Sequence, residues 1–144
     1  MQVTRLDPRA LSGLAAMLAG SGLPVADLSE AERIFFRFDD DRLAGYGGIE
    51  GSGADRLLRS LVVIPDRRRE GIGRAMLAAL EQETATLGVE RLHLLTTTAA
   101  KFFKADGYAV ADRLTAPASI TASREFTSLC PANAAFLIKT LDPA

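Results

Sequence analysis

A buried strand that runs through a glycine-containing turn into a long helix limits most strongly how this chain can fold. Residues 57–64 are aliphatic or β-branched on both faces of the predicted strand, which is typical of a strand in the middle of a sheet. Pro65 ends that strand, and apolar residues at helical spacing predict a helix over residues 71–87. A second buried strand is predicted over residues 89–95. Together they predict a βαβ unit with a right-handed parallel crossover.

Shorter elements are predicted on both sides of this unit. Helices are expected over residues 8–19, 99–105 and 117–128, and a helical turn over 30–33, where Ser29 and Glu32 have the spacing of a capping box. Strands are expected over residues 34–38, 43–50, 108–111 and 134–141. The predicted fold class is α/β, with one domain over residues 1–144 and a mixed central sheet of about six to seven strands flanked by helices.

Composition favours a small molecule as the partner. Hydrophobic residues make up 48% of the 144 residues, enough for one real core, and 17 basic against 18 acidic residues leave a net charge of −1. No basic patch indicates a nucleic acid or a membrane surface. The single cysteine, Cys130, allows no internal disulfide and predicts a reducing, cytoplasmic location. No cluster has metal-ligand spacing, and we expect a monomer, or a homodimer that pairs through an edge strand at 134–141.

The turn before the long helix has the features of a phosphate-binding loop. The first backbone N–H groups of a helix lack internal partners and lie at the positive end of the helix dipole. Gly71 and Gly73 let a diphosphate approach these groups, while Arg68, Arg69 and Arg74 add positive charge. Neither GxGxxG nor GxxxxGK[ST] occurs in the chain, so dinucleotide-binding and P-loop readings are excluded.

The loop and the segment after it resemble those of the GCN5-related N-acetyltransferase (GNAT) superfamily. Arg68-x-x-Gly71-x-Gly73 follows a Val-x-Pro strand end and matches the superfamily's coenzyme A pyrophosphate loop. A later strand leads into a helix with Phe102-Phe103 and then Gly107-Tyr108, where the family often has Gly-Phe. The resemblance covers about residues 43–110. It implies an acyl-CoA N-acyltransferase fold, acetyl-CoA as the cofactor and direct transfer of the acetyl group to an amine.

The resemblance also assigns the residues that hold acetyl-CoA. Family members splay the motif strand from its parallel neighbour, which exposes backbone groups to the pantetheine arm. The implied contacts are the strand residues Leu61, Val62 and Val63, the loop residues Arg68, Arg69, Glu70, Gly71, Ile72, Gly73 and Arg74, and the opposite wall of Thr98, Phe102 and Phe103. Capping of the next helix is an equally good role for the hydroxyls of residues 96–98.

Candidate catalytic residues lie near the same strand. Because an ammonium must lose a proton before it attacks, a base is needed, and Glu50 is the leading candidate, with a solvated strand end as its alternative. Ser60 either orders a water molecule or satisfies a backbone group. His93 is expected to be a hydrogen-bonded core residue. Phe103 occupies the position where the family often has a proton-donating tyrosine. That departure makes a catalytically degenerate acyl-CoA sensor or scaffold the alternative function.

The acceptor is predicted to be an amine on a small molecule. The helices at 11–18 and 30–33 and the segment 120–130 are expected to frame its pocket, with Arg33, Arg37 or Arg124 placed to meet a carboxylate. Six segments, at residues 58–61, 94–99, 102–103, 107–108, 125–126 and 129–131, resemble the arsenic-resistance-associated branch of these acetyltransferases. That resemblance implies an arsenical or phosphinothricin-like amino acid as acceptor. Cys130 would then be a soft arsenic ligand, or otherwise an inert packing residue.

Overall fold

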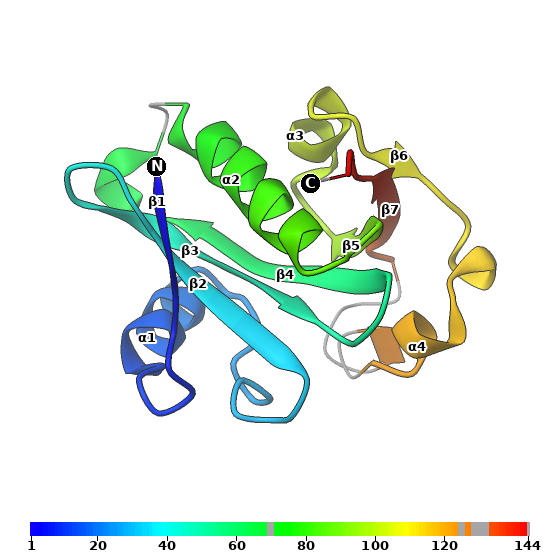
Figure 1. Cartoon of the computed structure of the whole chain (residues 1–144), viewed down its shortest axis with the longest axis horizontal. Coiled ribbons are helices and arrows are strands. Elements are labelled where there is room, and N and C mark those ends of the chain that lie inside the picture. The colour runs from blue at the N-terminus through cyan, green and yellow to red at the C-terminus, as the bar shows by residue number, and fades with distance from the viewer. Residues whose placement is uncertain (69–70, 124–125, 128–132, 144) are drawn as a thin grey trace.

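The computed structural model describes residues 1–68, 71–123, 126–127 and 133–143. Within them a seven-stranded mixed sheet has the order β1-β2-β3-β4-β5-β7-β6 (Figure 1). Its strands are β1 (Gln2–Arg5), β2 (Arg33–Asp39), β3 (Leu43–Glu50), β4 (Asp55–Val63), β5 (Arg91–Thr96), β6 (Ala109–Val110) and β7 (Ala135–Thr140). The helices are α1 (Ser12–Gly20), α2 (Ile72–Thr86), α3 (Ala100–Ala105) and α4 (Ala118–Thr121), with short 3₁₀ turns at Pro65–Arg67 and Arg113–Thr115.

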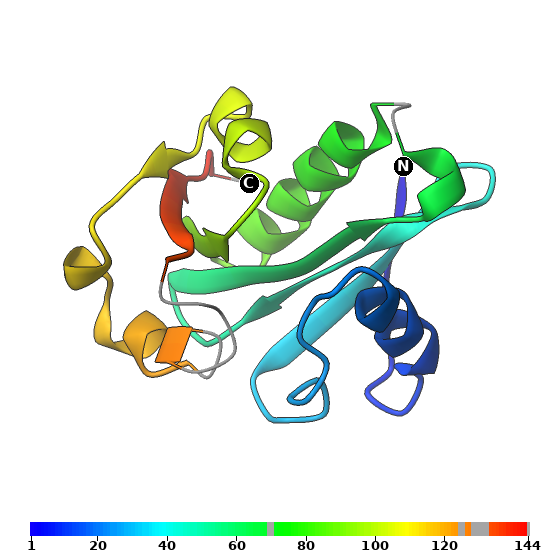
Figure 2. The same cartoon turned by 180° about the vertical axis from the view of Figure 1, so that it is seen from behind.

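Helices cover both faces of the sheet. α2 and α3 lie on one side and α1 and α4 on the other, as two opposite views show (Figures 1 and 2). Met76 and Leu80 of α2 are fully buried in the larger core cluster, whereas Leu14 and Leu18 of α1 pack on the other face. A third cluster brings Ile120 of α4 against the sheet. The predicted α/β fold with a mixed sheet is therefore confirmed.

The central βαβ unit is also as predicted. β4 and β5 pair in parallel, and α2 connects them along the chain. The other neighbouring strands pair antiparallel. β4 has three strands on each side of it in the sheet order, which explains why its sequence is apolar on both faces.

Four expectations about the elements were wrong. The helix predicted from residue 8 begins at Ser12, because the Asp7 carboxylate accepts the Arg9 N–H in a turn. Residues 30–32 form bends, with Glu32 at a φ of 61°, and Arg33 already belongs to β2. The helix expected over 117–128 is not continuous: α4 covers Ala118–Thr121, residues 122–123 form a turn and a bend, and residues 126–127 are π-helical. β7 lies between β5 and β6, so it is not an edge strand that could pair with a second copy.

Candidate functional site

The β4–β5 pair opens into a cavity part of the way along its length. The parallel pairing runs from Asp55↔Arg91 to Leu57↔His93 and then stops, although β4 continues to Val63. The opened strands line a cavity of about 810 Å³. The expected splay of the motif strand from its parallel neighbour is thus present, and backbone groups of both strands face the opening without a partner strand.

A bulge in β4 accompanies the opening. Tyr46 pairs with Val62 and Gly48 pairs with Arg59, so two residues of β4, Ser60 and the one after it, stand opposite a single residue of β3. Ser60 adopts a φ of 60°, which non-glycine residues rarely do. Bulges bend a strand, and this one lies on the stretch of β4 that no longer pairs with β5. Its position explains why the two strands separate there.

The cavity wall combines three segments and three single residues. The segments are the loop after α1 (residues 21–26), the outer part of β4 (residues 58–63), the end of β5 and the turn after it (residues 94–99); Arg68, Phe103 and Ala134 complete the wall. Seven of the residues singled out in the sequence lie in this wall: Ser60, Leu61, Val62, Val63, Arg68, Thr98 and Phe103. Glu50, Gly71, Ile72, Gly73, Arg74 and Phe102 do not.

The start of α2 lies beside this opening, and none of the described side chains caps it. Gly71 is the N-cap residue with a φ of 75°, and it has no side chain to bond the first N–H groups of the helix. Gly73 follows in the first turn, where a Cβ atom would stand 3.4 Å from the Phe102 ring. Phe102 therefore packs against the first turn of α2 rather than in the cavity wall. The backbone here offers donors to an anion.

The arginines near this turn have different environments. Arg67 is buried and bonds Asp40, so it is a structural residue. Arg68 lies in the cavity wall and donates to the Val63 carbonyl and the Ser21 hydroxyl, both at 3.2 Å. Arg74 is exposed and donates to the Ala105 carbonyl at 3.2 Å. The predicted contacts Arg69 and Glu70 lie outside the described residues.

Four charged side chains form a buried cluster behind the cavity. Arg59 of β4 donates to both Asp27 oxygens, at 2.5 and 2.8 Å, and to Glu50 Oε1 at 3.0 Å. Arg33 of β2 donates to Asp27 Oδ2 at 2.9 Å and lies 3.4 Å from Glu50 Oε2. The Arg59 and Asp27 side chains are fully buried. This Asp27–Arg33–Glu50–Arg59 cluster balances two carboxylates against two guanidinium groups, as buried charges require.

The cluster controls the protonation of Asp27. Burial raises the pKa of that carboxyl group, but the hydrogen bonds from Arg59 and Arg33 outweigh burial and hold the pKa at about 2. Asp27 is therefore an anion that is committed to two arginines. Glu50 has the same two partners and a side chain that is 8% exposed, so it is not a solvated residue at a strand end.

His93 has the structural environment expected for it. It is buried, its Nε2 atom lies 2.8 Å from Asp55 Oδ1, and its ring stacks on Phe136 at 5.8 Å. Asp55 also accepts two hydrogen bonds from Arg91, and together these bonds lower the pKa of Asp55 to about 2. His93 is thus a hydrogen-bonded core residue.

The aromatic residues after β5 leave no free phenol at the cavity. Phe103 lines the cavity and packs edge-on against Tyr108, with the ring centroids 5.4 Å apart. Tyr108 is buried and its hydroxyl donates to Glu81 at 2.8 Å. Burial, with the charge of Glu81 second, raises the pKa of Tyr108 far above its ordinary value. Neither ring therefore offers a proton to the cavity.

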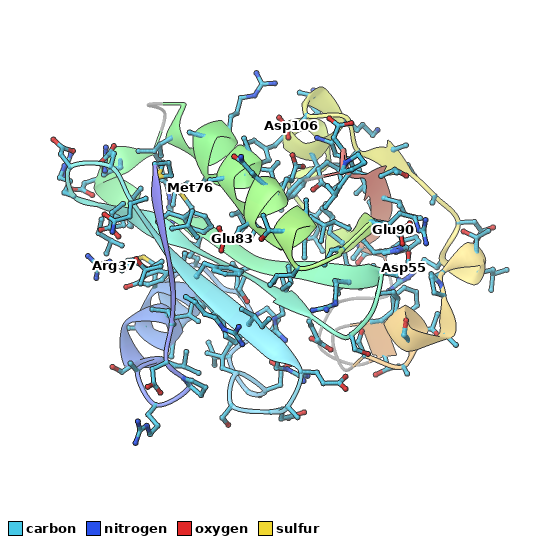
Figure 3. All side chains as sticks on the ribbon, in the orientation of Figure 1. Arg37, Asp55, Met76, Glu83, Glu90 and Asp106 are labelled. Atoms are coloured by element: carbon cyan, nitrogen blue, oxygen red, sulfur yellow. The ribbon has the colours of Figure 1, made fainter. Side chains whose placement is uncertain are left out.

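The other polar candidates lie in varied places. Thr96 Oγ1 accepts the Ala99 N–H at 3.0 Å in the turn before α3, but in the described residues no side chain caps α3 itself, so the expected helix cap is not formed. Arg33 belongs to the buried cluster, and Arg37 pairs with Asp39 on the side of the molecule opposite Asp55 (Figure 3). Arg124 and Cys130 lie outside the described residues. None of the described carboxylate-binding candidates thus reaches the cavity wall.

Sequence reasoning missed the residues that build one side of the site. It did not single out Asp27 or Arg59. The connection between the two predicted N-terminal helical segments was expected to be a substrate loop, and residues 21–26 of that connection do line the cavity. A signal was present, because Arg59 is a charged residue inside an otherwise apolar central strand. A buried arginine needs an acidic partner, but the sequence alone did not indicate which acid it would be.

Comparison with known proteins places this architecture in a family. The model of an acetyltransferase (GNAT) domain matches residues 30–110, more than half of the chain. No curated protein matches the sequence. Among the described residues, no helix is long and apolar enough to cross a membrane.

Several solved structures share the fold at low sequence identity. Tetrahymena GCN5 aligns with a TM-score of 0.79 at 12% identity, over 100% of this chain and 98% of its own. The ribosomal-protein-S18-alanine N-acetyltransferase of Escherichia coli gives 0.71 at 17%, over 99% and 95%. N-acetylglutamate synthase from Neisseria gonorrhoeae, complexed with coenzyme A and L-arginine, gives 0.75 at 18%, over 97% of this chain and 33% of its own. This chain thus spans about a third of the length of that synthase.

Proposed function

This chain belongs to the GNAT acetyltransferase family, and we propose that it transfers the acetyl group of acetyl-CoA to the amine of a small molecule. It is an N-acetyltransferase by family. The observation that carries the proposal is the cavity between the separated ends of β4 and β5, which leads to the uncapped start of α2. A strand pair that opens beside a helix N-terminus offers backbone bonds to an extended chain and donors to a diphosphate.

The residues at the opening fit acetyl-CoA. Leu61, Val62 and Val63 lie in the wall on the unpaired part of β4, where they would hold the pantetheine arm. The first N–H groups of α2, from Ile72 onward, would receive the diphosphate, with the guanidinium groups of Arg68 and Arg74 nearby. When bound, acetyl-CoA supplies the acetyl group as a thioester. The similar N-acetylglutamate synthase was solved with coenzyme A, which supports the same ligand here.

Glu50 and Ser60 are the proposed residues for handling the amine's proton. Glu50 does not line the cavity, so it does not take the proton by direct contact. Ser60 does line the cavity, and its Oγ atom accepts from Arg59 Nε at 3.2 Å, while Arg59 Nη1 also bonds Glu50. We propose that a water molecule held by the Ser60 hydroxyl takes the proton and passes it toward Glu50. Glu50 then acts at a distance, through water.

The charges of the cavity wall favour an acceptor that carries an anionic group. In the described part of the wall there is no carboxylate side chain; the charge of Arg59 is balanced by Asp27 and Glu50 behind it, and Arg68 adds a positive charge. Arg68 bonds the Val63 carbonyl and the Ser21 hydroxyl. Both groups are neutral, so these two bonds do not balance its positive charge. An amino acid with an acidic group suits such a wall better than a polyamine does. An arsenical or phosphinothricin-like amino acid is the candidate that the sequence resemblance adds.

The test is turnover with a panel of amines. Free thiol released from acetyl-CoA is measured with phosphinothricin and acidic amino acids, with spermidine and an aminoglycoside, and with a peptide bearing an N-terminal alanine. We expect release with the anionic amino acids and a rate at least tenfold lower with the polycations. Release only with polycations or with the peptide would contradict the proposed acceptor. Binding of acetyl-CoA without release for any amine would favour the sensor.

A Glu50→Gln variant tests the proton path in the same assay. If Glu50 is the terminal base, kcat falls by about 100-fold or more while acetyl-CoA binding is retained. An unchanged kcat would remove Glu50 from the mechanism.

A further inference from the structure

We infer that Arg59 is a positioning residue that fixes the acceptor side of the cavity, with Asp27 as its partner. The inference rests on the proposed function, because it concerns how this same cavity holds the acceptor. Arg59 lies in the cavity wall and its guanidinium group is fully buried. Its charge is balanced by the Asp27 and Glu50 carboxylates. The side chain is therefore arranged to hold protein groups in place.

One guanidinium group joins three parts of the chain. Nη1 and Nη2 bond Asp27, Nη1 bonds Glu50 at the end of β3, and Nε bonds the Ser60 hydroxyl in the β4 bulge. Asp27 and Arg59 are 32 positions apart in the sequence, so this contact is a tertiary link. The planar guanidinium group presents its donors in a fixed fork, which makes such a link directional as well as strong.

The link to Asp27 fastens the loop that forms a cavity wall. Residues 21–26 line the cavity, and Asp27 follows them directly. At its other end the loop is held by α1, where the Leu23 N–H bonds the Leu18 carbonyl at 2.9 Å. Leu28 is buried in a cluster that includes Leu18 of α1 and Val62 of β4, so packing also supports the loop. The Asp27–Arg59 pair therefore adds a directional link between the end of the loop and β4, beside the bonds from Arg33 to Asp27 and from Arg68 to Ser21.

The diphosphate is expected at the start of α2 and not at this link, although Arg68 also bonds Ser21 of the loop. The start of α2 takes its shape from Gly71 and from contact with Phe102. Loss of the link is therefore expected to weaken acceptor binding and to leave acetyl-CoA binding intact. If the ion pair were merely structural, its loss would weaken acceptor binding and acetyl-CoA binding together, because less of the protein would be folded.

The chain offers a second ion pair as a control. Asp55 and Arg91 also make a two-point ion pair, and the pKa of Asp55 is also held at about 2, but this pair is partly exposed whereas Asp27 and Arg59 are fully buried. That pair joins β4 to β5 at the end where the strands are still paired, and neither residue lines the cavity. Asp55→Asn therefore removes an ion pair of the same geometry without touching the loop.

The experiment compares Asp27→Asn, Arg59→Lys and Asp55→Asn with the wild type. For the best acceptor of the amine panel, we expect the first two variants to raise acceptor KM by at least tenfold, with the acetyl-CoA dissociation constant within twofold. Asp55→Asn should leave acceptor KM unchanged even where it lowers the melting temperature. Asp27→Glu, which keeps the carboxylate, should recover part of the loss. An unchanged acceptor KM in Asp27→Asn, or an equal rise in Asp55→Asn, would overturn the inference.

Hydrogen exchange separates this inference from the proposed function. If the wild type releases no thiol from acetyl-CoA with any amine of the panel, the acceptor proposal fails, but the effect of the Asp27–Arg59 link on the loop can still be measured. Amides of residues 21–26 should then exchange at least tenfold faster in Asp27→Asn and in Arg59→Lys than in the wild type or in Asp55→Asn. Equal exchange in all four proteins would show that Arg59 does not fix the loop.

Discussion

The glycine at position 71, which the loop motif includes, is needed for the backbone conformation at the start of α2. Its φ of 75° lies in the left-handed region, where a side chain costs about 1–2 kcal/mol. No atom would obstruct a Cβ at this position, so the requirement comes from the backbone conformation and not from crowding. The sequence predicted a glycine turn here because a glycine would let a diphosphate approach the backbone. In the structure, the left-handed conformation of Gly71 is the reason that a glycine is needed.

Gly71→Ala is predicted to lower the free energy of unfolding by about 1–2 kcal/mol, because alanine resists the left-handed conformation. Gly20→Ala is the control: Gly20 ends α1 with no positive φ and with open space around its Cβ position. That change should be neutral or stabilising. Urea unfolding of both variants checks the prediction, and equal effects would refute it.

Asp27 gives the protein a specific acid sensitivity. Its pKa is about 2 in the folded state against 3.8 ordinarily, so the unfolded state binds the proton more readily. The stability that Asp27 contributes is therefore complete above about pH 4 and is lost as the pH falls toward 2. A shift of this size corresponds to about 2 kcal/mol.

The prediction is measured by urea unfolding between pH 6 and pH 2.5. The wild type should lose stability through this range, and Asp27→Asn should show a decline about 2 kcal/mol smaller, because the titrating group is absent. Asp27→Asn is also expected to be several kcal/mol less stable at pH 6, since it leaves buried guanidinium groups with less negative charge. An identical decline in both proteins would show that Asp27 does not titrate as described.

The location of a single residue was predictable from the sequence where that residue type strongly prefers one environment. His93 in a buried strand, the glycines of the turn and Phe103 beside the cavity were all found from the sequence, and the structure places each as expected. The Asp27–Arg59 contact was not, because either residue alone is compatible with many partners. Pairing between charges far apart in sequence depends on the fold, which the local pattern does not contain.

The β4 bulge is the element that creates the cavity. Ser60 sits in it with a φ of 60°, a conformation that favours glycine over alanine. We predict that Ser60→Gly is more stable than Ser60→Ala by about 1 kcal/mol. In a regular strand the order would be reversed, because glycine weakens strands. Denaturant unfolding of the two variants decides this, and a more stable alanine variant would mean that the bulge is not retained in solution.

Elements with a clear hydrophobic period were predicted well, and irregular ones were not. β3 was predicted with the bounds that the structure shows, and α2 differs by one residue at each end. β1 was missed because its four residues have no apolar alternation. The turn at residues 30–33 was taken for a helix on a capping-box spacing, whereas Arg33 instead joins β2 and bonds Asp27. Tertiary contacts thus overrode the local signal there.

At the scale of the whole molecule, the sequence predicted the strands but not their order. β7 is inserted between β5 and β6, so the C-terminal strand closes the sheet beside the cavity instead of forming an edge. The outer strands are β1 and the two-residue β6. Any pairing of copies through the sheet must therefore use those edges. Strand order is set by contacts between distant segments, which explains why local patterns did not reveal it.

The account as a whole depends on the cavity and the start of α2 forming one site for acetyl-CoA. The most direct test is calorimetric titration of acetyl-CoA into the wild type, Gly73→Glu and Ala78→Glu. A Cβ at Gly73 makes only ordinary contacts, at 3.4 Å or more, so the glutamate adds charge at the first turn without forcing the backbone. Ala78 is exposed and lies further along the same helix. Ala78→Glu therefore adds the same negative charge to α2, but away from its first turn.

The account predicts binding to the wild type and to Ala78→Glu with similar affinity, and at least tenfold weaker binding to Gly73→Glu. Carboxylates repel a diphosphate most where the helix N–H groups must receive it. Equal binding by all three proteins would place acetyl-CoA elsewhere. No binding to the wild type would contradict the central claim.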